Sequence, residues 1–154
     1  MAERGRGFDE RSQDQVYNSL PMAETARILV VDDEPDTVGL LELTLRTAGF
    51  EIQTAMSGQE GLRLALEKAY DLILLDLMMP DISGFDVMRS VQELKGASAA
   101  TPVVILTARD RPEDRESGAR LGAVGYLIKP ATRGQLLDAI RKALDRSGGD
   151  GNPA

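Results

Sequence analysis

Short apolar runs that alternate with amphipathic helical segments constrain the fold of this chain more than any other feature. Two of these runs, Ile28 to Val31 and Leu72 to Leu75, contain only aliphatic residues. Strands that are apolar on both faces are typical of parallel sheets covered by helices on both sides. The alternation therefore predicts repeated βαβ units and an α/β fold with a parallel sheet.

The expected elements follow from composition and periodicity. Five segments predict strands, and the third and fourth are apolar enough to be central: 27–31, 51–55, 72–76, 102–107 and 125–128. Helices are expected between and after these strands. Four sets of apolar residues at helical spacing should face the core: Val38, Leu41, Leu45 and Ala48; Leu62, Ala65, Leu66 and Ala69; Val87, Met88, Val91 and Leu94; and Leu136, Leu137, Ile140 and Leu144.

Local signals mark several helix ends. Ser57 with Glu60, and Thr132 with Gln135, fit the capping box, in which each side chain accepts a hydrogen bond from the other residue's main chain. Gly49 suits the left-handed conformation that often ends a helix. We therefore expect helices to begin at the first two positions and one to end at the third.

The segment from Arg111 to Leu121 differs from the other predicted helices. It is mostly polar, with Pro112 near its start and Gly118 inside it. Such a segment has little apolar surface to anchor it, so we expect it to be mobile.

Length and the character of the two ends indicate one domain with tails. The 154 residues suffice for one packed core. We expect a disordered tail over 1–26, a domain over 27–146 and a flexible tail over 147–154, because both ends are polar, rich in glycine and charge, and without periodicity. The sequence leaves open whether translation starts at Met22.

Composition argues against several classes of function. The apolar runs fall far short of the roughly 20 residues that span a membrane, and the first residues lack a secretory signal. The net charge of −7 argues against a nucleic-acid interface. With no cysteine and no histidine, any chemistry must rest on carboxylates, hydroxyls, lysine and main-chain groups. We expect a cytoplasmic protein that binds neither membranes nor nucleic acids.

Chemically active side chains follow the apolar runs of four predicted strands. They are Asp32, Asp33 and Glu34 after the first strand, Asp76 at the end of the third, Thr107 at the end of the fourth and Lys129 after the fifth. The carboxyl ends of parallel strands meet at one edge, where doubly wound sheets bind ligands. Clustered carboxylates favour a hard cation such as Mg²⁺, while a lysine and a hydroxyl suit phosphoryl oxygens. The set predicts a phosphoryl-transfer site.

Each member of this set has an ordinary structural explanation when it is taken alone. A lone Asp76 is more often a helix cap or turn residue, Lys129 a solvated charge, and Thr107 a strand residue of high β propensity. Their joint placement at the ends of different strands favours the functional interpretation.

Four motifs carry a resemblance to a known family. VVDDEP, LLDLMMPDISG, VVILTARD and GYLIKP are similar, in order and spacing, to the receiver domain of two-component response regulators, over roughly Arg27 to Arg146. The resemblance implies a flavodoxin-like doubly wound sheet of five parallel strands in the order 2-1-3-4-5, with helices on both faces. It also implies a switch of protein–protein interactions that is not an enzyme beyond its own phosphorylation and dephosphorylation.

The resemblance also implies roles for the acceptor site. Asp76 would be the nucleophile that takes a phosphoryl group from a phosphohistidine on a sensor histidine kinase or a histidine phosphotransfer protein. Thr107 and Lys129 would bind phosphoryl oxygens. Because the chain has no histidine, it cannot itself be the donor.

A Mg²⁺ cofactor is part of the same resemblance. Asp33 and Asp76 would contact the ion directly, Asp32 would act mainly through metal-bound water, and the main-chain carbonyl of Met78 would complete the protein ligands. Glu34 matches an acid that is common in the family. A first-turn charge that favours the helix N-terminus is the simpler interpretation of Glu34.

The resemblance implies a switch and an output surface. Tyr126 aligns with the family's switch aromatic, which turns inward when Thr107 moves toward the phosphoryl group; an ordinary half-buried strand residue is the alternative. Lys129-Pro130 resembles the family's cis peptide, although trans is the commoner form. The fourth helix, fifth strand and fifth helix would bind a downstream protein target. Whether phosphorylation produces a dimer is left open.

Two further positions would border the phosphoryl group. Met78 lies two residues after Asp76, and Arg109 lies two residues after Thr107. An apolar Met78 cannot orient an attacking water, whereas Arg109 could pair with phosphate oxygens. We therefore hypothesise slow self-dephosphorylation.

Several alternatives remain open from the sequence. The chain could be a stand-alone receiver or a receiver fragment of a longer response regulator. A pseudo-receiver would keep the fold as an interaction module that is never phosphorylated. A phosphatase of the haloacid-dehalogenase class also forms an aspartyl phosphate with Mg²⁺, but that class needs an Asp two residues after its nucleophile, where this chain has Met78.

Overall fold

The computed structural model describes residues 25–149. The tails expected over 1–26 and 147–154 therefore lie mostly outside the described residues. The last helix, α6 (Arg133–Gly149), continues past the expected domain boundary at Arg146.

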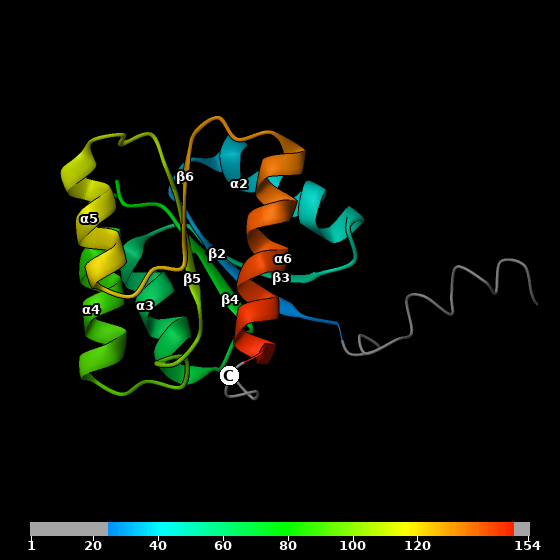
Figure 1. Cartoon of the computed structure of the whole chain (residues 1–154). Coiled ribbons are helices and arrows are strands. Elements are labelled where there is room, and N and C mark those ends of the chain that lie inside the picture. Colours follow the sequence, from blue (N-terminus) through cyan, green and yellow to red (C-terminus); the bar gives the residue numbers. More distant parts are fainter. Residues whose placement is uncertain (1–24, 150–154) are drawn as a thin grey trace, which may run out of the picture.

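A single parallel sheet forms the centre of the structure (Figure 1). Its strands are β2 (Arg27–Val31), β3 (Glu51–Ala55), β4 (Leu72–Leu75), β5 (Val103–Thr107) and β6 (Gly125–Ile128). All four pairings are parallel, and the spatial order is β3-β2-β4-β5-β6. In chain order this is 2-1-3-4-5, so the doubly wound α/β fold predicted from the sequence is confirmed.

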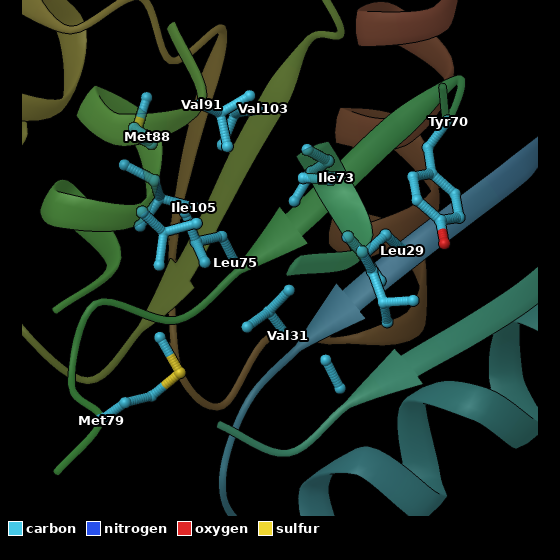
Figure 2. Close-up of a cluster of buried hydrophobic side chains, with 14 of the residues drawn as sticks. Leu29, Val31, Tyr70, Ile73, Leu75, Met79, Met88, Val91, Val103 and Ile105 are labelled. Atoms are coloured by element: carbon cyan, nitrogen blue, oxygen red, sulfur yellow. The ribbon is translucent and has the colours of Figure 1, made fainter. Parts of the chain in front are cut away.

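Helices cover both faces of the sheet. They are α2 (Pro35–Thr47), α3 (Gly58–Glu67), α4 (Gly84–Glu93), α5 (Pro112–Arg120) and α6. Alternate strand residues face opposite layers: Leu29 and Val31 pack with residues of α3 and α4, whereas Ile28 and Val30 pack with residues of α2 and α6. Figure 2 shows the first of these two clusters. Each face of the sheet therefore has its own apolar core.

The predicted helix ends form as the local signals indicate. Ser57 Oγ accepts a hydrogen bond from the Glu60 N–H at 3.1 Å, but Glu60 Oε1 accepts from the Met56 N–H at 3.3 Å rather than from Ser57, so one of the two capping-box bonds forms there. Thr132 and Gln135 make both bonds of the capping box, at 2.9 and 3.0 Å. Gly49 takes a φ of 102°, which only glycine adopts easily. The caps are local interactions, which explains why the sequence predicts them.

Two details of helix packing differ from the prediction. Leu64 of α3 is buried although it was not in the predicted set, and Ala69 is exposed because α3 ends at Glu67, before Ala69 is reached. Leu94 was expected in the core, but it is 64% exposed because it forms the C-cap of α4. Among the described residues, no helix is long and apolar enough to cross a membrane.

Candidate functional site

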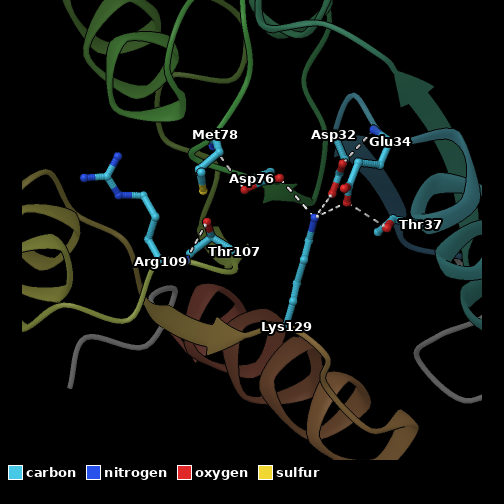
Figure 3. A network of polar contacts seen from close by, with 8 residues as sticks. All are labelled: Asp32, Glu34, Thr37, Asp76, Met78, Thr107, Arg109 and Lys129. Atoms are coloured by element: carbon cyan, nitrogen blue, oxygen red, sulfur yellow. Dashed lines mark hydrogen bonds and ion pairs between the residues drawn. The ribbon is translucent and has the colours of Figure 1, made fainter.

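The carboxyl edge of the sheet positions the predicted site residues. Main-chain hydrogen bonds continue the strand ladders one residue further, from Asp32 N to Ala55 O (3.1 Å) and from Asp76 N to Val31 O (3.0 Å). The N–H of Lys129 likewise donates to the Thr107 carbonyl at 2.8 Å. These bonds fix the backbone of each site residue to the sheet, so the side chains converge (Figure 3).

Three aspartates form an acidic cluster at this edge. Asp32, Asp33 and Asp76 each place a carboxylate oxygen within 4.8 Å of the others. Asp32 is 2% exposed and Asp76 is 4% exposed, whereas Asp33 is only half-buried. Carboxylates this close in low-dielectric surroundings repel one another strongly. The cluster therefore needs a positive partner.

The ammonium group of Lys129 provides positive charge to two of these aspartates. Its Nζ lies 2.8 Å from Asp32 Oδ2, 3.0 Å from Asp76 Oδ2 and 3.1 Å from Glu34 Oε1. Burial alone would lower the pKa of Lys129, but its hydrogen bonds to Asp32 and Asp76 raise that pKa well above the ordinary value. Burial raises the pKa of Asp32, against the lowering effect of the Lys129 hydrogen bond. Lys129 thus stays charged among the acids.

Glu34 has a larger part in this network than its sequence position indicated. Besides serving as the N-cap residue of α2, it pairs with Lys129 and accepts a hydrogen bond from Thr37 Oγ1 at 3.1 Å. The hydrogen bond from Lys129 holds the pKa of Glu34 below its ordinary value. The first-turn interpretation therefore understated its contacts.

Thr107 and Met78 flank the Asp76 carboxylate (Figure 3). Thr107 is fully buried at the end of β5, and its Oγ1 accepts a hydrogen bond from the Arg109 N–H at 3.3 Å. The N–H of Met78 donates to Asp76 Oδ1 at 3.1 Å, while the Met78 side chain is exposed. The main chain at Met78 is therefore tied to Asp76.

Tyr126 lies next to the loop that follows β5. It is half-buried, and its hydroxyl donates to the Arg109 carbonyl at 2.9 Å. The guanidinium of Arg115 lies 5.0 Å from the centre of its ring, within cation–π range. The Lys129–Pro130 peptide is cis.

The structure places the Arg109 side chain differently from the sequence prediction. Its guanidinium makes two hydrogen bonds to Asp114 of α5, from Nε at 3.0 Å and from Nη2 at 3.1 Å. In Figure 3 the side chain extends away from Asp76. Arg109 is therefore committed to a carboxylate on α5, and the pairing with phosphate oxygens expected from the sequence would require it to leave that partner.

Asp81 is a second residue whose contacts the sequence did not reveal. Its carboxylate accepts hydrogen bonds from the N–H groups of Gly58, at 3.0 Å, and Gln59, at 2.7 Å. These are the first residues of α3, so Asp81 caps that helix from the loop after β4. The contact joins the loop that carries Met78 to a neighbouring helix.

Comparison with known proteins assigns the family. The model of the response regulator receiver domain matches residues 28–141. The chain belongs to the response regulator receiver family. The matched range contains every residue of the site described above, and the match is to receivers rather than to the haloacid-dehalogenase class.

Relatives of known sequence are longer than this chain, and the match covers about half of each. It is 40% identical over 125 residues to the uncharacterized transcriptional regulatory protein YkoG of Bacillus subtilis, covering 81% of this chain and 54% of YkoG. It is 41% identical over 122 residues to the transcriptional regulatory protein PrrA of Mycobacterium tuberculosis, covering 79% of this chain and 51% of PrrA. The receiver spans about half the length of these curated relatives.

Solved receiver structures share the fold. The chemotaxis response regulator CheY4 of Vibrio cholerae matches with a TM-score of 0.71 and 33% identity, covering 77% of this chain and 98% of CheY4. The response regulator TrrA of Thermotoga maritima, solved in complex with Mg²⁺ and BeF, matches with a TM-score of 0.68 and 34% identity, covering 77% of this chain and 99% of TrrA.

Proposed function

We propose that this receiver accepts a phosphoryl group on Asp76 from a histidine kinase or a histidine phosphotransfer protein. The observation that carries the proposal is the convergence of Asp32, Asp76 and Lys129 at one edge of the sheet (Figure 3), with the Asp33 carboxylate close to the other two. A structural ion pair alone does not require a third, half-buried acid beside two buried ones. A phosphoryl-transfer site does, because it must hold a cation.

The nucleophile of the proposed reaction is a largely buried carboxylate. One oxygen of Asp76 attacks the phosphorus, an O–P bond forms, and the P–N bond of the donor breaks. A donor ring that is protonated on its other nitrogen leaves as neutral imidazole. The two Asp76 oxygens have separate partners, the Met78 N–H at Oδ1 and Lys129 at Oδ2, so the carboxylate is already oriented.

Charge on the transferred group would be met by residues that are already in place. Because Lys129 remains charged, its ammonium group would pair with the phosphoryl oxygens in place of the Asp76 carboxylate. The Thr107 hydroxyl, fixed at the end of β5, would donate to another phosphoryl oxygen.

The donor set fits Mg²⁺. It consists only of oxygen ligands, from Asp32, Asp33, Asp76 and the carbonyl of Met78, and the three carboxylates lie close enough to share an ion. When bound, Mg²⁺ would neutralise charge on the carboxylates and on the phosphoryl oxygens. Asp33 is the most accessible of the three, which suits it for direct contact.

The receiver would then act on other proteins through α5, β6 and α6. The segment 27–146 would be the working unit, in the cytoplasm, where its kinase and its downstream protein target would meet it. Longer relatives that are transcriptional regulators are consistent with an output domain in such proteins. The kinase would approach Asp76 and the exposed side of α2, which carries Glu42 and Arg46.

Intact-mass spectrometry after incubation with acetyl phosphate and Mg²⁺ tests the proposal. Wild type should gain the mass of one phosphoryl group, Asp76→Asn should not, and omission of Mg²⁺ should reduce the gain. Asp138→Asn is the matched control, because Asp138 is an exposed residue of α6 paired only with Lys142. It should gain the phosphoryl group as wild type does.

The same experiment addresses the pseudo-receiver alternative. No gain in wild type, with acetyl phosphate or with a panel of phosphorylated histidine phosphotransfer proteins, would favour an interaction module that is never phosphorylated. A gain in Asp76→Asn equal to that of wild type would place the acceptor elsewhere.

A further inference from the structure

Three groups of Arg109 make contacts in three different directions. Its N–H donates to Thr107 Oγ1 at 3.3 Å, and its carbonyl accepts from the Tyr126 hydroxyl at 2.9 Å. Its guanidinium makes the two bonds to Asp114 of α5. One residue therefore touches the predicted phosphoryl-binding hydroxyl, the predicted switch aromatic and a helix of the predicted output surface.

Few side chains within helix α5 are buried against the body of the receiver, although its C-cap residue Leu121 packs against the core. Its buried residues are Asp114 and Gly118, and the rest of the helix is polar and largely exposed. Gly118 packs so closely that a Cβ there would lie 2.8 Å from Ile105 Cδ1. Close packing of a glycine limits how near the helix comes but supplies little attraction, because glycine has no side chain to bury. Asp114 is thus the main side chain of α5 that faces inward.

The pair between Arg109 and Asp114 is asymmetric in burial. The Asp114 side chain is 10% exposed, whereas the Arg109 side chain is 41% exposed. The geometry is bidentate, which fixes both distance and orientation. Moving the guanidinium would leave a nearly buried carboxylate without its cation, and that is the costly way to break such a pair. Asp114, and α5 with it, should therefore follow Arg109 when the loop moves.

We propose that Arg109 is a positioning residue that couples Thr107 to α5. A displacement of Thr107 toward a phosphoryl group on Asp76 would move the Arg109 main chain, and the paired guanidinium would carry Asp114 and the first turn of α5 with it. The inference rests on the proposed function, because it needs a phosphoryl group to move Thr107. It assigns Arg109 a role in transmission rather than in binding phosphate.

The competing possibility is that Arg109 leaves Asp114 for the phosphoryl oxygens. Two features oppose it. Lys129 already supplies a cation next to Asp76, and departure of the guanidinium would strand Asp114. If Arg109 binds the phosphoryl group, its removal should change the phosphoryl half-life; if it only transmits motion, the half-life should stay within about twofold of wild type.

Hydrogen–deuterium exchange of the segment 112–121, with and without acetyl phosphate and Mg²⁺, tests the coupling. In wild type, phosphorylation should change exchange in this segment. In Arg109→Ala, exchange in the unphosphorylated protein should rise about tenfold, and phosphorylation should no longer change it. Arg109→Lys, which keeps one charged contact, should restore part of the response. All values are normalised to the phosphorylated fraction measured by intact mass.

Arg115→Ala is the matched control. Arg115 also lies on α5 and contacts Tyr126 and Asp110, but among the described residues it makes no contact with Arg109 or Thr107 side chains, so it lacks the bidentate pair under test. It should leave the phosphorylation-dependent change in exchange in place. Retention of that change in Arg109→Ala, or its loss in Arg115→Ala alone, would overturn the proposal.

A double-mutant cycle separates this inference from the proposed function. In the unphosphorylated receiver, Arg109→Ala and Asp114→Asn should affect exchange of α5 non-additively, because each removes the same pair. Additive effects would refute the link whatever the state of Asp76. If wild type shows no gain of phosphate mass, both the coupling and the proposed function are refuted. If it shows the gain but α5 does not respond, the coupling alone is refuted.

Discussion

The same substitution at two helical glycines should have opposite effects on stability. At Gly84, the first residue of α4, an added Cβ would contact the main-chain carbonyl oxygen of Asp76 most closely and would lie 3.0 Å from Leu77 Cα. Both neighbours are backbone atoms, so neither can rotate away. At Gly39, in the middle of α2, an added Cβ would meet nothing within 4 Å. Gly84→Ala and Gly39→Ala thus form a matched pair.

The magnitudes follow from these surroundings. Overpacking against fixed neighbours costs about 1–3 kcal/mol, and the gain in helix propensity at the first position of a helix offsets only part of it. We expect Gly84→Ala to lose about 1–2 kcal/mol. Gly39→Ala should gain about 0.5–1 kcal/mol, because alanine loses less conformational freedom than glycine in a helix interior. The two variants should therefore differ by roughly 2 kcal/mol.

Urea unfolding followed by circular dichroism measures this difference. With a urea dependence of about 2 kcal/mol per molar, the two midpoints should differ by about 1 M. A Gly84→Ala variant as stable as wild type would refute the reasoning, since it would mean that the backbone around Asp76 yields easily. Gly84→Ala should also slow phosphate uptake, because the displaced carbonyl belongs to the acceptor residue.

Three other changes have effects that the structure predicts. Tyr70→Phe should leave stability unchanged or raise it by about 1 kcal/mol in urea unfolding, because the buried Tyr70 hydroxyl is without a hydrogen-bond partner among the described residues. Asp81→Ala should cost about 0.5–1 kcal/mol through loss of the α3 cap. Burial alone would raise the Asp81 pKa, but hydrogen bonds from the Gln59 and Gly58 N–H groups hold it below its ordinary value. The loss of stability in Asp81→Ala should therefore be present above about pH 4 and disappear as pH falls through the lowered pKa. Met78→Asn should shorten the phosphoryl half-life measured by intact mass, and an unchanged half-life would contradict a role for this apolar side chain in excluding water.

The sequence predicted the sheet and the edge where the site lies because both depend on repeating patterns. Apolar strands, and polar residues directly after them, are readable without knowledge of tertiary contacts. The N-cap bonds at Ser57 and Thr132 formed for the same reason, since each partner lies three residues away. The assigned roles of the site residues remain predictions that the experiments above test.

Contacts between distant segments were beyond the sequence pattern. Asp81 caps a helix that begins more than twenty residues earlier, which no local spacing indicates. The partner of Arg109 depends on how α5 docks, and a polar helix offers no periodic apolar face from which to predict docking. On α3, Leu64 rather than Ala69 is buried because the helix ends at Glu67, before Ala69 is reached.

The complete burial of β4 and β5 has a consequence for how insertions would be tolerated. Every residue of these strands is buried, so a shift by one position would place each side chain on the wrong face, and register is fixed by the core rather than by the connecting loops. A residue added in 94–102 should be costly, because Ala97, Ser98 and Thr101 donate hydrogen bonds to the carbonyls of Leu66, Lys68 and Tyr70. One added between Asp76 and Gly84 should be costly as well, because the Met78 N–H donates to Asp76 Oδ1 and the Gly84 N–H donates to the Leu77 carbonyl. Neither of these loops should therefore tolerate a change in length easily.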